Sequence, residues 1–284
     1  MRYDLDMPRS LPAQPWTEPL PPASPPSGLS LHRLPTGSYD TRAAFAFRGG
    51  SFSDKRHFAA TAVLVRHPQG DVLIDAGFGS GVAEHMKAQP RFARAPFTAT
   101  VPAGRQLADA GYDADRLAGV LLTHAHWDHV SGLDEVNAPI WINDRELDYA
   151  RQSADGTVFR AVTEDRPVHR YSLDGPAYLG FGPSFDVHGD GSIVVALAGG
   201  HTPGSVVVFV TPPDGPRYAF IGDLTWQSDG ITRGAERPYL LRRMADDDPA
   251  SVRDGLSRIM GLAELMRIVP AHDSAAFESI PCLR

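Results

Sequence analysis

The chain has 284 residues, of which 42% are hydrophobic, and this supplies enough apolar surface for one large domain with a sizeable core. Its formal net charge of −7 argues against nucleic acid as the main partner, because phosphate binding requires a basic face. The sequence lacks both the run of about 18 apolar residues that spans a membrane and a secretory signal pattern. A lone cysteine, Cys282, excludes an internal disulfide, so we expect a cytoplasmic protein without a membrane partner.

Residues 1–28 differ from the rest of the chain because eight of its 25 prolines lie there. Proline removes a backbone donor and opposes both helix formation and strand pairing, so this segment predicts an arm outside the folded domain. The arm would be either a flexible, polyproline-like tail or a segment that lies over a neighbouring subunit of a homodimer, with Trp16 as its anchor. Residues 29–284 would form the domain itself.

The domain is predicted to consist mainly of strands, with helices between them. Strands are predicted at residues 59–66, 71–75, 117–123, 139–142, 192–198, 205–211, 217–221 and 266–269. Helices are predicted at residues 103–110 and 144–151, and a last one begins at Asp248-Pro249, where a capping aspartate precedes a first-turn proline. Most of the strand runs are apolar on both faces, which favours sheets packed on each other and covered outside by helices.

The most informative motif is the segment 124–129, HAHWDH, directly after the apolar strand expected at 117–123. His124 and His126 are two residues apart and can point to the same side of an extended segment. Asp128 and His129 follow as the chain turns into a helix. Neutral imidazole and carboxylate groups are good ligands for zinc and other first-row divalent metals. The motif therefore predicts a metal site.

Three further residues lie where an apolar strand gives way to a loop, and all can converge at one edge of the sheets. His201 lies in the turn 199–205 (GGHTPGS), Asp223 ends the strand that closes with IGD, and His272 follows the last strand. Each is a weak signal alone, since a single histidine after a strand more often packs or caps. Together with HAHWDH they complete two metal shells.

The combination of HxHxDH, GHTPG, a strand ending in GD and a late strand ending in histidine resembles the metallo-β-lactamase superfamily. The resemblance covers roughly residues 58–273. It implies an α/β fold, an αββα sandwich with the site at the open edge of the sheets. Asp75, in the family-like segment 75–79 (DAGFG), would support a ligand rather than bind metal.

The resemblance also implies two divalent metal ions, with zinc expected and iron, manganese or cobalt as alternatives. One ion would be held by His124, His126 and His201, the other by Asp128, His129 and His272, and Asp223 would bridge both. Two such ions can share a hydroxide at neutral pH, because each cation lowers the pKa of bound water. Asp223 would then act in catalysis through this bridge, and Asp128 as a proton carrier. The other histidines match no ligand position and are interpreted as surface or packing residues, with His169 and His188 as the strongest exceptions.

Within the superfamily the chain most resembles the N-acyl-homoserine lactonases and their phosphotriesterase and arylesterase relatives. The supporting features are a compact domain, a full set of seven ligands and the long segment 224–266. Those lactonases commonly carry a tyrosine three positions after the bridging aspartate, whereas this chain has Trp226. Indole offers one N–H donor and no titratable hydroxyl. We expect Trp226 to line the substrate pocket, with a buried packing role as the alternative.

Three hypotheses follow for the activity. The leading one is hydrolysis of a lactone or ester of a small, partly apolar substrate by a metal-bridging hydroxide. The second is a phosphotriesterase-like or broad-specificity hydrolase with the same site. β-Lactamase and thioesterase activities are less favoured, because Cys282 lies beyond the last ligand and only twelve residues follow His272. The third is a non-catalytic sensor that kept the fold, which the complete ligand set disfavours.

Overall fold

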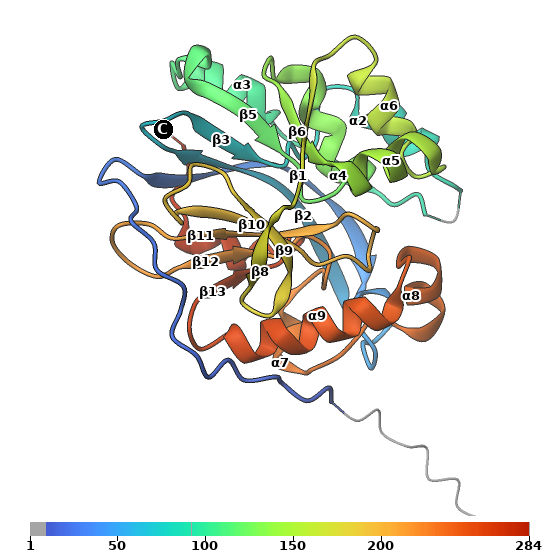
Figure 1. Ribbon diagram of the computed structural model, residues 1–284. Helices are drawn as coiled ribbons and strands as arrows, with labels where there is room; N and C mark the ends of the chain where they lie inside the picture. Colours follow the sequence, from blue (N-terminus) through green and yellow to red (C-terminus); the bar gives the residue numbers. More distant parts are fainter. Residues whose placement is uncertain (1–9, 92, 284) are drawn as a thin grey trace, which may run out of the picture.

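Two β-sheets face each other in the computed structural model, which describes residues 10–91 and 93–283 (Figure 1). In this part of the chain the first sheet has seven strands in the order β4-β1-β2-β3-β5-β6-β7. The strands are β1 (Ser30–Arg42), β2 (Lys55–Arg66), β3 (Asp71–Ile74), β4 (Phe97–Ala99), β5 (Leu117–Leu121), β6 (Ile140–Asn143) and β7 (Val168–Tyr171). Strands β3, β5, β6 and β7 pair in parallel, and β1 pairs antiparallel with both β2 and β4.

The second sheet has six strands among the described residues, in the order β13-β12-β11-β10-β9-β8. They are β8 (Gly175–Tyr178), β9 (Phe181–Asp186), β10 (Ile193–Leu197), β11 (Val206–Val210), β12 (Tyr218–Phe220) and β13 (Arg267–Val269). Its pairs are antiparallel except for the last, in which β12 and β13 run in parallel. The late strand β13 is thereby placed beside β12, and the loops that follow both strands lie together.

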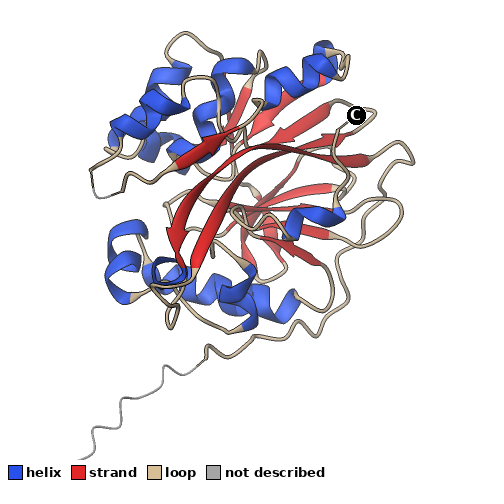
Figure 2. Ribbon diagram, turned by 180° about the vertical axis from the view of Figure 1, so that it is seen from behind, coloured by secondary structure: helices blue, strands red, loops and turns tan. Residues whose placement is uncertain are grey.

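Helices cover the outer faces of both sheets, so the layers run helix, sheet, sheet, helix (Figure 2). The helices are α1 (Ala43–Ala46), α2 (Val82–Ala88), α3 (Ala103–Asp109), α4 (Trp127–Val130), α5 (Asp144–Gln152), α6 (Thr157–Thr163), α7 (Ser228–Thr232), α8 (Tyr239–Ala245) and α9 (Pro249–Leu262). Helices α2 to α6 lie over the first sheet, and α7 to α9 lie over the second (Figure 1). As predicted, Asp248 caps the last helix and accepts a hydrogen bond of 2.9 Å from the amide of Ala250.

The alternation of side chains along β11 shows how the layers are held together. Val206, Val208 and Val210 point into the core between the two sheets. Val207 and Phe209 point the other way, into the core beneath α9. Because side chains alternate along a strand, a strand covered on both faces must be apolar at every position. The predicted αββα sandwich is confirmed, and the continuous apolar runs are its signature in the sequence.

The two sheets meet at the edge where the predicted ligands lie. The amide of Val206, at the start of β11, donates a 3.0 Å hydrogen bond to the carbonyl of Thr123, just beyond β5. The amide of Ala59 in β2 donates one of 3.2 Å to the carbonyl of His272. These bonds tie the ends of strands from opposite sheets to each other. The loops at this edge are therefore held on a rigid base.

The described part of the proline-rich arm, residues 10–28, packs against its own domain (Figure 1). Trp16 and Leu20 lie against the core beneath α9. Three backbone amides of the arm donate to domain carbonyls: Leu11 to Gly234 at 2.8 Å, Gln14 to Ser257 at 2.9 Å and Ser24 to Asp190 at 2.7 Å. This packing differs from the expected flexible tail, because the apolar side chains between the prolines find a surface that composition does not reveal. The contact with a second subunit stays a prediction. Residues 1–9 lie outside the described residues, and the division at residue 28 stays a prediction.

Sequence reasoning missed the long strand β1. Its pattern is interrupted at Pro35 and Gly37, where the pairing with β2 shifts register. A Cβ at Gly37, whose φ is +151°, would lie 2.4 Å from the carbonyl oxygen of Thr98 in β4. Glycine is required there because β4 approaches closely.

Among the described residues, no helix is both long and apolar enough to cross a membrane.

Candidate metal centre

The seven predicted ligands come together at the edge where the two sheets meet. His124, His126, Asp128 and His129 follow β5, His201 lies between β10 and β11, and Asp223 and His272 follow β12 and β13. Within residues 10–91 and 93–283, candidate ligand atoms within 4.8 Å of one another occur in three overlapping sets. The first ligand group is His124, His126 and His201, the second ligand group is Asp128, His129 and His272, and the third set joins His124, His129 and Asp223.

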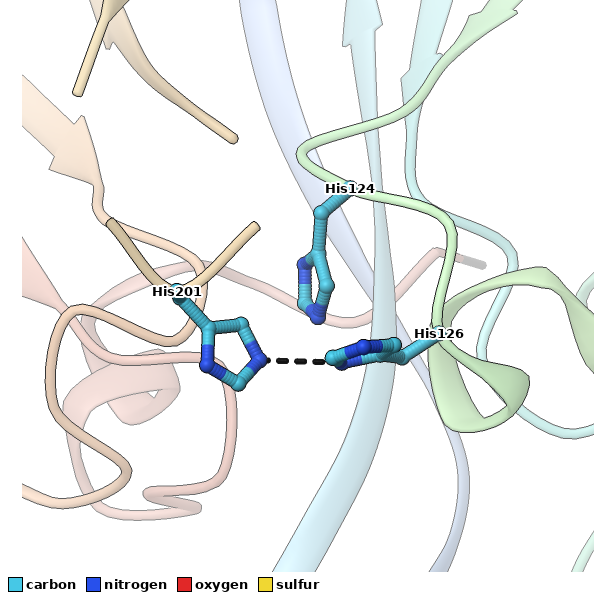
Figure 3. Close-up of side chains that lie close together, drawn as sticks. All are labelled: His124, His126 and His201. Carbon is cyan, nitrogen blue, oxygen red and sulfur yellow. Dashed lines mark hydrogen bonds between the residues drawn. The ribbon is translucent and has the colours of Figure 1, made fainter. Parts of the chain in front are cut away.

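The side chains of the first ligand group point toward one another from two separate segments of the chain (Figure 3). His201 Nε2 lies 2.9 Å from His126 Nδ1. The ring centroid of His124 lies 4.7 Å from that of His126 and 4.8 Å from that of His201. Nitrogen atoms arranged in this way face a common point, as three ligands of one metal ion must.

Asp223 directs one carboxylate oxygen toward each ligand group. Its Oδ1 lies 3.1 Å from His272 Nε2 and 3.4 Å from His129 Nε2, both in the second group. Its Oδ2 lies 3.4 Å from His201 Nε2 and 3.9 Å from His124 Nε2, both in the first. Asp128 joins the second group through its Oδ2, which lies 3.5 Å from His272 Nε2. Asp223 therefore has the geometry of a bridge.

Several of these atoms are buried without a hydrogen-bond partner among the described residues. They are Nε2 of His124, His129 and His272 and Oδ1 of Asp223. A buried polar atom without a partner costs about 1–3 kcal/mol, so native folds seldom leave four of them in one place. Metal ions at this position would supply the missing partners. The donor set, imidazole nitrogens with carboxylate oxygens, fits zinc and other first-row divalent metals.

The second ligand group is oriented by contacts at the far side of its imidazole rings. His129 Nδ1 lies 2.8 Å from Asp75 Oδ2, and the two oxygens of Asp75 also accept hydrogen bonds of 2.8 Å from the amide and hydroxyl of Thr123. His272 Nδ1 donates to the carbonyl of Ala59 at 2.8 Å. Asp75 thus supports a ligand, as predicted. Such contacts hold each ring with Nε2 toward the metal position.

The first ligand group has corresponding supports. His201 Nδ1 lies 3.0 Å from Asp246 Oδ1, which also accepts a 2.8 Å hydrogen bond from the guanidinium of Arg237. His126 presents Nδ1 to its group, and its Nε2 lies 3.4 Å from the hydroxyl of Tyr149. That hydroxyl donates to Asp155 Oδ2 at 3.1 Å. The rings of His201 and His126 are therefore each held from behind by a polar partner.

The electrostatics of the site suit metal binding. Burial lowers the pKa of His124 well below its usual value, and burial with the neighbouring His201 lowers the pKa of His126 to about 4. Burial also acts to lower the pKa of His129, but Asp75 and Asp223 raise it further than burial lowers it. Burial acts to raise the pKa of Asp223, and the surrounding histidines bring it well below its usual value. Asp223 is therefore a carboxylate, and His124 and His126 are neutral imidazoles.

A sequence profile of the metallo-beta-lactamase superfamily matches residues 56–272. The chain belongs to the metallo-β-lactamase superfamily. The match begins in β2, ends at His272 and includes all seven predicted ligands. Together with the names of its relatives, it establishes the chain as a metal-dependent hydrolase.

Members of the superfamily with related sequences carry general names. A probable metallo-hydrolase of Bacillus subtilis is 30% identical over 120 residues, which is 40% of this chain and about half, 52%, of that protein. A probable metallo-hydrolase of Mycobacterium bovis is 24% identical over 247 residues, 76% of this chain and 75% of that protein.

Solved structures share the fold of this chain at low sequence identity. An N-acyl homoserine lactone hydrolase with bound N-hexanoyl-L-homoserine superimposes with a TM-score of 0.70 at 16% identity, over 90% of this chain and 98% of that one. A dizinc quorum-quenching lactonase in complex with a product superimposes with a TM-score of 0.57 at 17% identity, over 88% and 92%. These likenesses show the fold alone.

Trp226 lies directly beside the carboxylate of Asp223. Its indole Nε1 donates a 2.7 Å hydrogen bond to Asp223 Oδ2. The half-buried ring packs at 5.4 Å from the ring of Phe58, and the guanidinium of Arg237 stacks over it at 4.4 Å. Arg237 also donates to the backbone carbonyl of Asp223. The side chain is thus placed beside Asp223, and its contact with substrate stays a prediction.

Sequence reasoning missed the residues that support the first ligand group. Asp246 is the first of three consecutive aspartates, and nothing in the sequence distinguishes it from its neighbour Asp247. Tyr149 lies within a predicted helix and carries no motif. Of the histidines left outside the site, His188 stacks on His67 at 3.9 Å and His169 packs on Trp141 at 5.6 Å. Both pack on rings outside the ligand groups.

Proposed function

We propose that this enzyme is a dinuclear metal hydrolase that cleaves a lactone or ester of a small, partly apolar substrate. The observation that carries the proposal is the position of Asp223, with one oxygen toward each of two complete ligand groups. The dizinc lactonase among the similar structures supports two metals in this fold, with zinc as the proposed ion. The similar structure that holds N-hexanoyl-L-homoserine supports a product with an apolar acyl chain.

Two bound divalent cations would supply water of lowered pKa as the nucleophile and would polarise the carbonyl oxygen of the substrate. The chain's own part begins with Asp223, which holds the two groups at a fixed separation. Asp128 lies at the second group and is the proposed carrier of a proton to the leaving oxygen. The pKa of Tyr39 is raised well above its usual range, by burial first and then by Asp128 and Asp223. Its hydroxyl therefore keeps its proton beside Asp128.

Aromatic side chains line the second ligand group and favour a partly apolar substrate. Tyr39 packs at 5.3 Å from Phe58 and at 5.7 Å from Trp127. Phe58 in turn contacts Trp226 and stacks on His272 at 5.5 Å. Tyr39, Trp127 and Trp226 are half-buried, whereas Phe58 is buried behind them. An alkyl or aryl group packed on these three rings would be removed from water.

One observation favours a phosphotriesterase-like or broad-specificity hydrolase as the second candidate. Trp226 stands where the resembling lactonases commonly carry a tyrosine, and its N–H donates to Asp223. It therefore offers no hydroxyl to a substrate carbonyl. Without a hydroxyl at this position, binding of the substrate depends less on a planar carbonyl group and more on the metal ions.

A substrate panel on the metal-loaded enzyme separates these candidates. The panel contains acyl-homoserine lactones, aryl esters, phosphotriesters and β-lactams, with the Asp223→Ala variant and metal-free enzyme as controls. We expect the highest kcat/KM for a lactone or carboxylic ester, and its loss in both controls. A phosphotriester at the top of the panel would replace the leading candidate by the second. No turnover of any substrate by fully loaded enzyme would contradict both.

A further inference from the structure

Glu146, on α5, is a fully buried acidic residue whose carboxylate lies outside the two ligand groups. Its Oε1 accepts a 2.7 Å hydrogen bond from the amide of Ala125. Its Oε2 accepts one of 2.6 Å from the hydroxyl of Thr202 and one of 3.2 Å from the amide of Gly204. Burying a carboxylate is costly unless donors surround it, and here three donors do.

The three donors belong to the two segments that carry the first ligand group. Ala125 lies between His124 and His126, and Thr202 and Gly204 follow His201. Figure 3 shows that these histidines approach each other from different parts of the chain. A single carboxylate thus joins the backbone of one segment to that of the other. Neither of its oxygens is needed as a ligand, because both are used by these hydrogen bonds.

The surrounding contacts hold Glu146 in this position. The side chain of Asn143 caps the start of α5 by accepting from the amide of Glu146 at 3.1 Å, and it donates to the carbonyl of Gly204 at 2.7 Å. A Cβ at Gly204 would lie 2.2 Å from the backbone nitrogen of Glu146. Only glycine permits this approach. Contact with Glu146, rather than with metal, therefore explains why GHTPG has a threonine and a glycine at its third and last positions.

We propose that Glu146 is a positioning residue that sets the geometry of the first ligand group by joining its two backbone segments. The inference rests on the proposed function only in assigning the first group its own metal ion. Loss of the carboxylate would leave two buried amides and a hydroxyl without their acceptor. The segments would then separate, and His201 would move relative to His124 and His126. The second ligand group, supported by Asp75 and Ala59, would keep its arrangement.

The test uses Glu146→Gln, in which the side chain keeps its size but turns an amide N–H toward an N–H donor. Asp148→Asn is the matched control, because Asp148 is an exposed carboxylate on the same helix. Zinc affinity is measured by competition with a chromophoric chelator, and Co²⁺ absorption reports the coordination geometry. To assign each ion, both substitutions are repeated in Asp128→Ala, which weakens the second group, and in His126→Ala, which weakens the first.

We expect Glu146→Gln to weaken zinc binding about 10–100-fold in the Asp128→Ala background and less than threefold in the His126→Ala background. Asp148→Asn should change neither. Equal losses in both backgrounds would overturn the proposal, because they indicate a general loss of structure. If Glu146→Gln does not fold, Thr202→Val removes one of the three hydrogen bonds and should weaken the first group in the same direction. A wild-type enzyme that holds a single metal ion would contradict the proposed function. The change in affinity for that ion caused by Glu146→Gln would still decide the present inference.

Discussion

Replacing Asp246 by asparagine should weaken metal binding and destabilise the metal-free protein at the same time. The carboxylate of Asp246 is buried and meets two groups, His201 Nδ1 at 3.0 Å and the guanidinium of Arg237 at 2.8 Å. Asparagine keeps the shape and one acceptor but removes the charge. The buried Arg237 then loses its ionic partner, and His201 Nδ1 faces a neutral amide oxygen in place of the carboxylate that orients and polarises its ring.

The two effects have different magnitudes and can be measured separately. Removing one partner of a buried ion pair typically costs about 3–5 kcal/mol, and the acceptor that asparagine keeps places the expected loss near 3 kcal/mol. Mutation of the carboxylate partner of a metal-ligating histidine typically costs about 10–100-fold in metal affinity. Urea unfolding in excess chelator gives the first quantity, because metal makes no contribution there. Chelator competition on the folded enzyme gives the second.

Asp247→Asn is the matched control, because the neighbouring Asp247 has an exposed side chain. It should leave both quantities unchanged. The reasoning is refuted if Asp246→Asn keeps wild-type zinc affinity while the free energy of unfolding falls. That result would make the Asp246–Arg237 pair a structural contact without a role in orienting His201.

Three further predictions follow from the same structure. Trp226→Phe should change the ratio of lactone to phosphotriester turnover severalfold. The free energy of unfolding should fall by no more than about 1.5–3 kcal/mol, the contribution of one hydrogen bond to a charged group, because phenylalanine keeps the packing of the half-buried ring. A larger loss of stability with an unchanged ratio would indicate a core role. Trp16→Ala should lower the free energy of unfolding by about 1–2 kcal/mol in urea titration, since the indole packs against the core beneath α9; unchanged stability would restore the free-tail interpretation. Burial raises the pKa of Glu146 from 4.5 to about 7, so in metal-free protein the unfolded chain releases this proton first as pH rises. The free energy of unfolding should therefore fall by up to about 3 kcal/mol between pH 4.5 and 7, and Glu146→Gln should flatten this dependence; an unaltered slope would contradict the burial argument.

The sequence predicted those parts of the molecule that are marked by a pattern within a short run of consecutive residues. Residues 205–211 show an apolar side chain at nearly every position, and this pattern already requires a strand covered on both faces. HAHWDH places four candidate ligands within six residues after such a strand. His201, Asp223 and His272 could be added because each also follows an apolar run.

The remaining features depend on contacts between distant segments. Glu146 acts on residues 21 and 56 positions away along the chain, and Asp246 on one 45 positions away. Acidic residues at a helix start or in a run of aspartates are usually solvated, so their types alone indicate nothing unusual. β1 was missed because Pro35 and Gly37 interrupt its alternation. The arm was interpreted from its prolines, whereas its packing is decided by Trp16 and Leu20.

The metal content of the wild-type and Asp223→Ala proteins tests the central proposal most directly. Purified protein is loaded with zinc, freed of excess metal by gel filtration and analysed by mass spectrometry for metal per chain. The wild type should contain two equivalents. Asp223→Ala should lose occupancy and activity together, because Asp223 directs one oxygen to each ligand group. A fully active wild type with one equivalent, or an Asp223→Ala variant that keeps two, would contradict the dinuclear site.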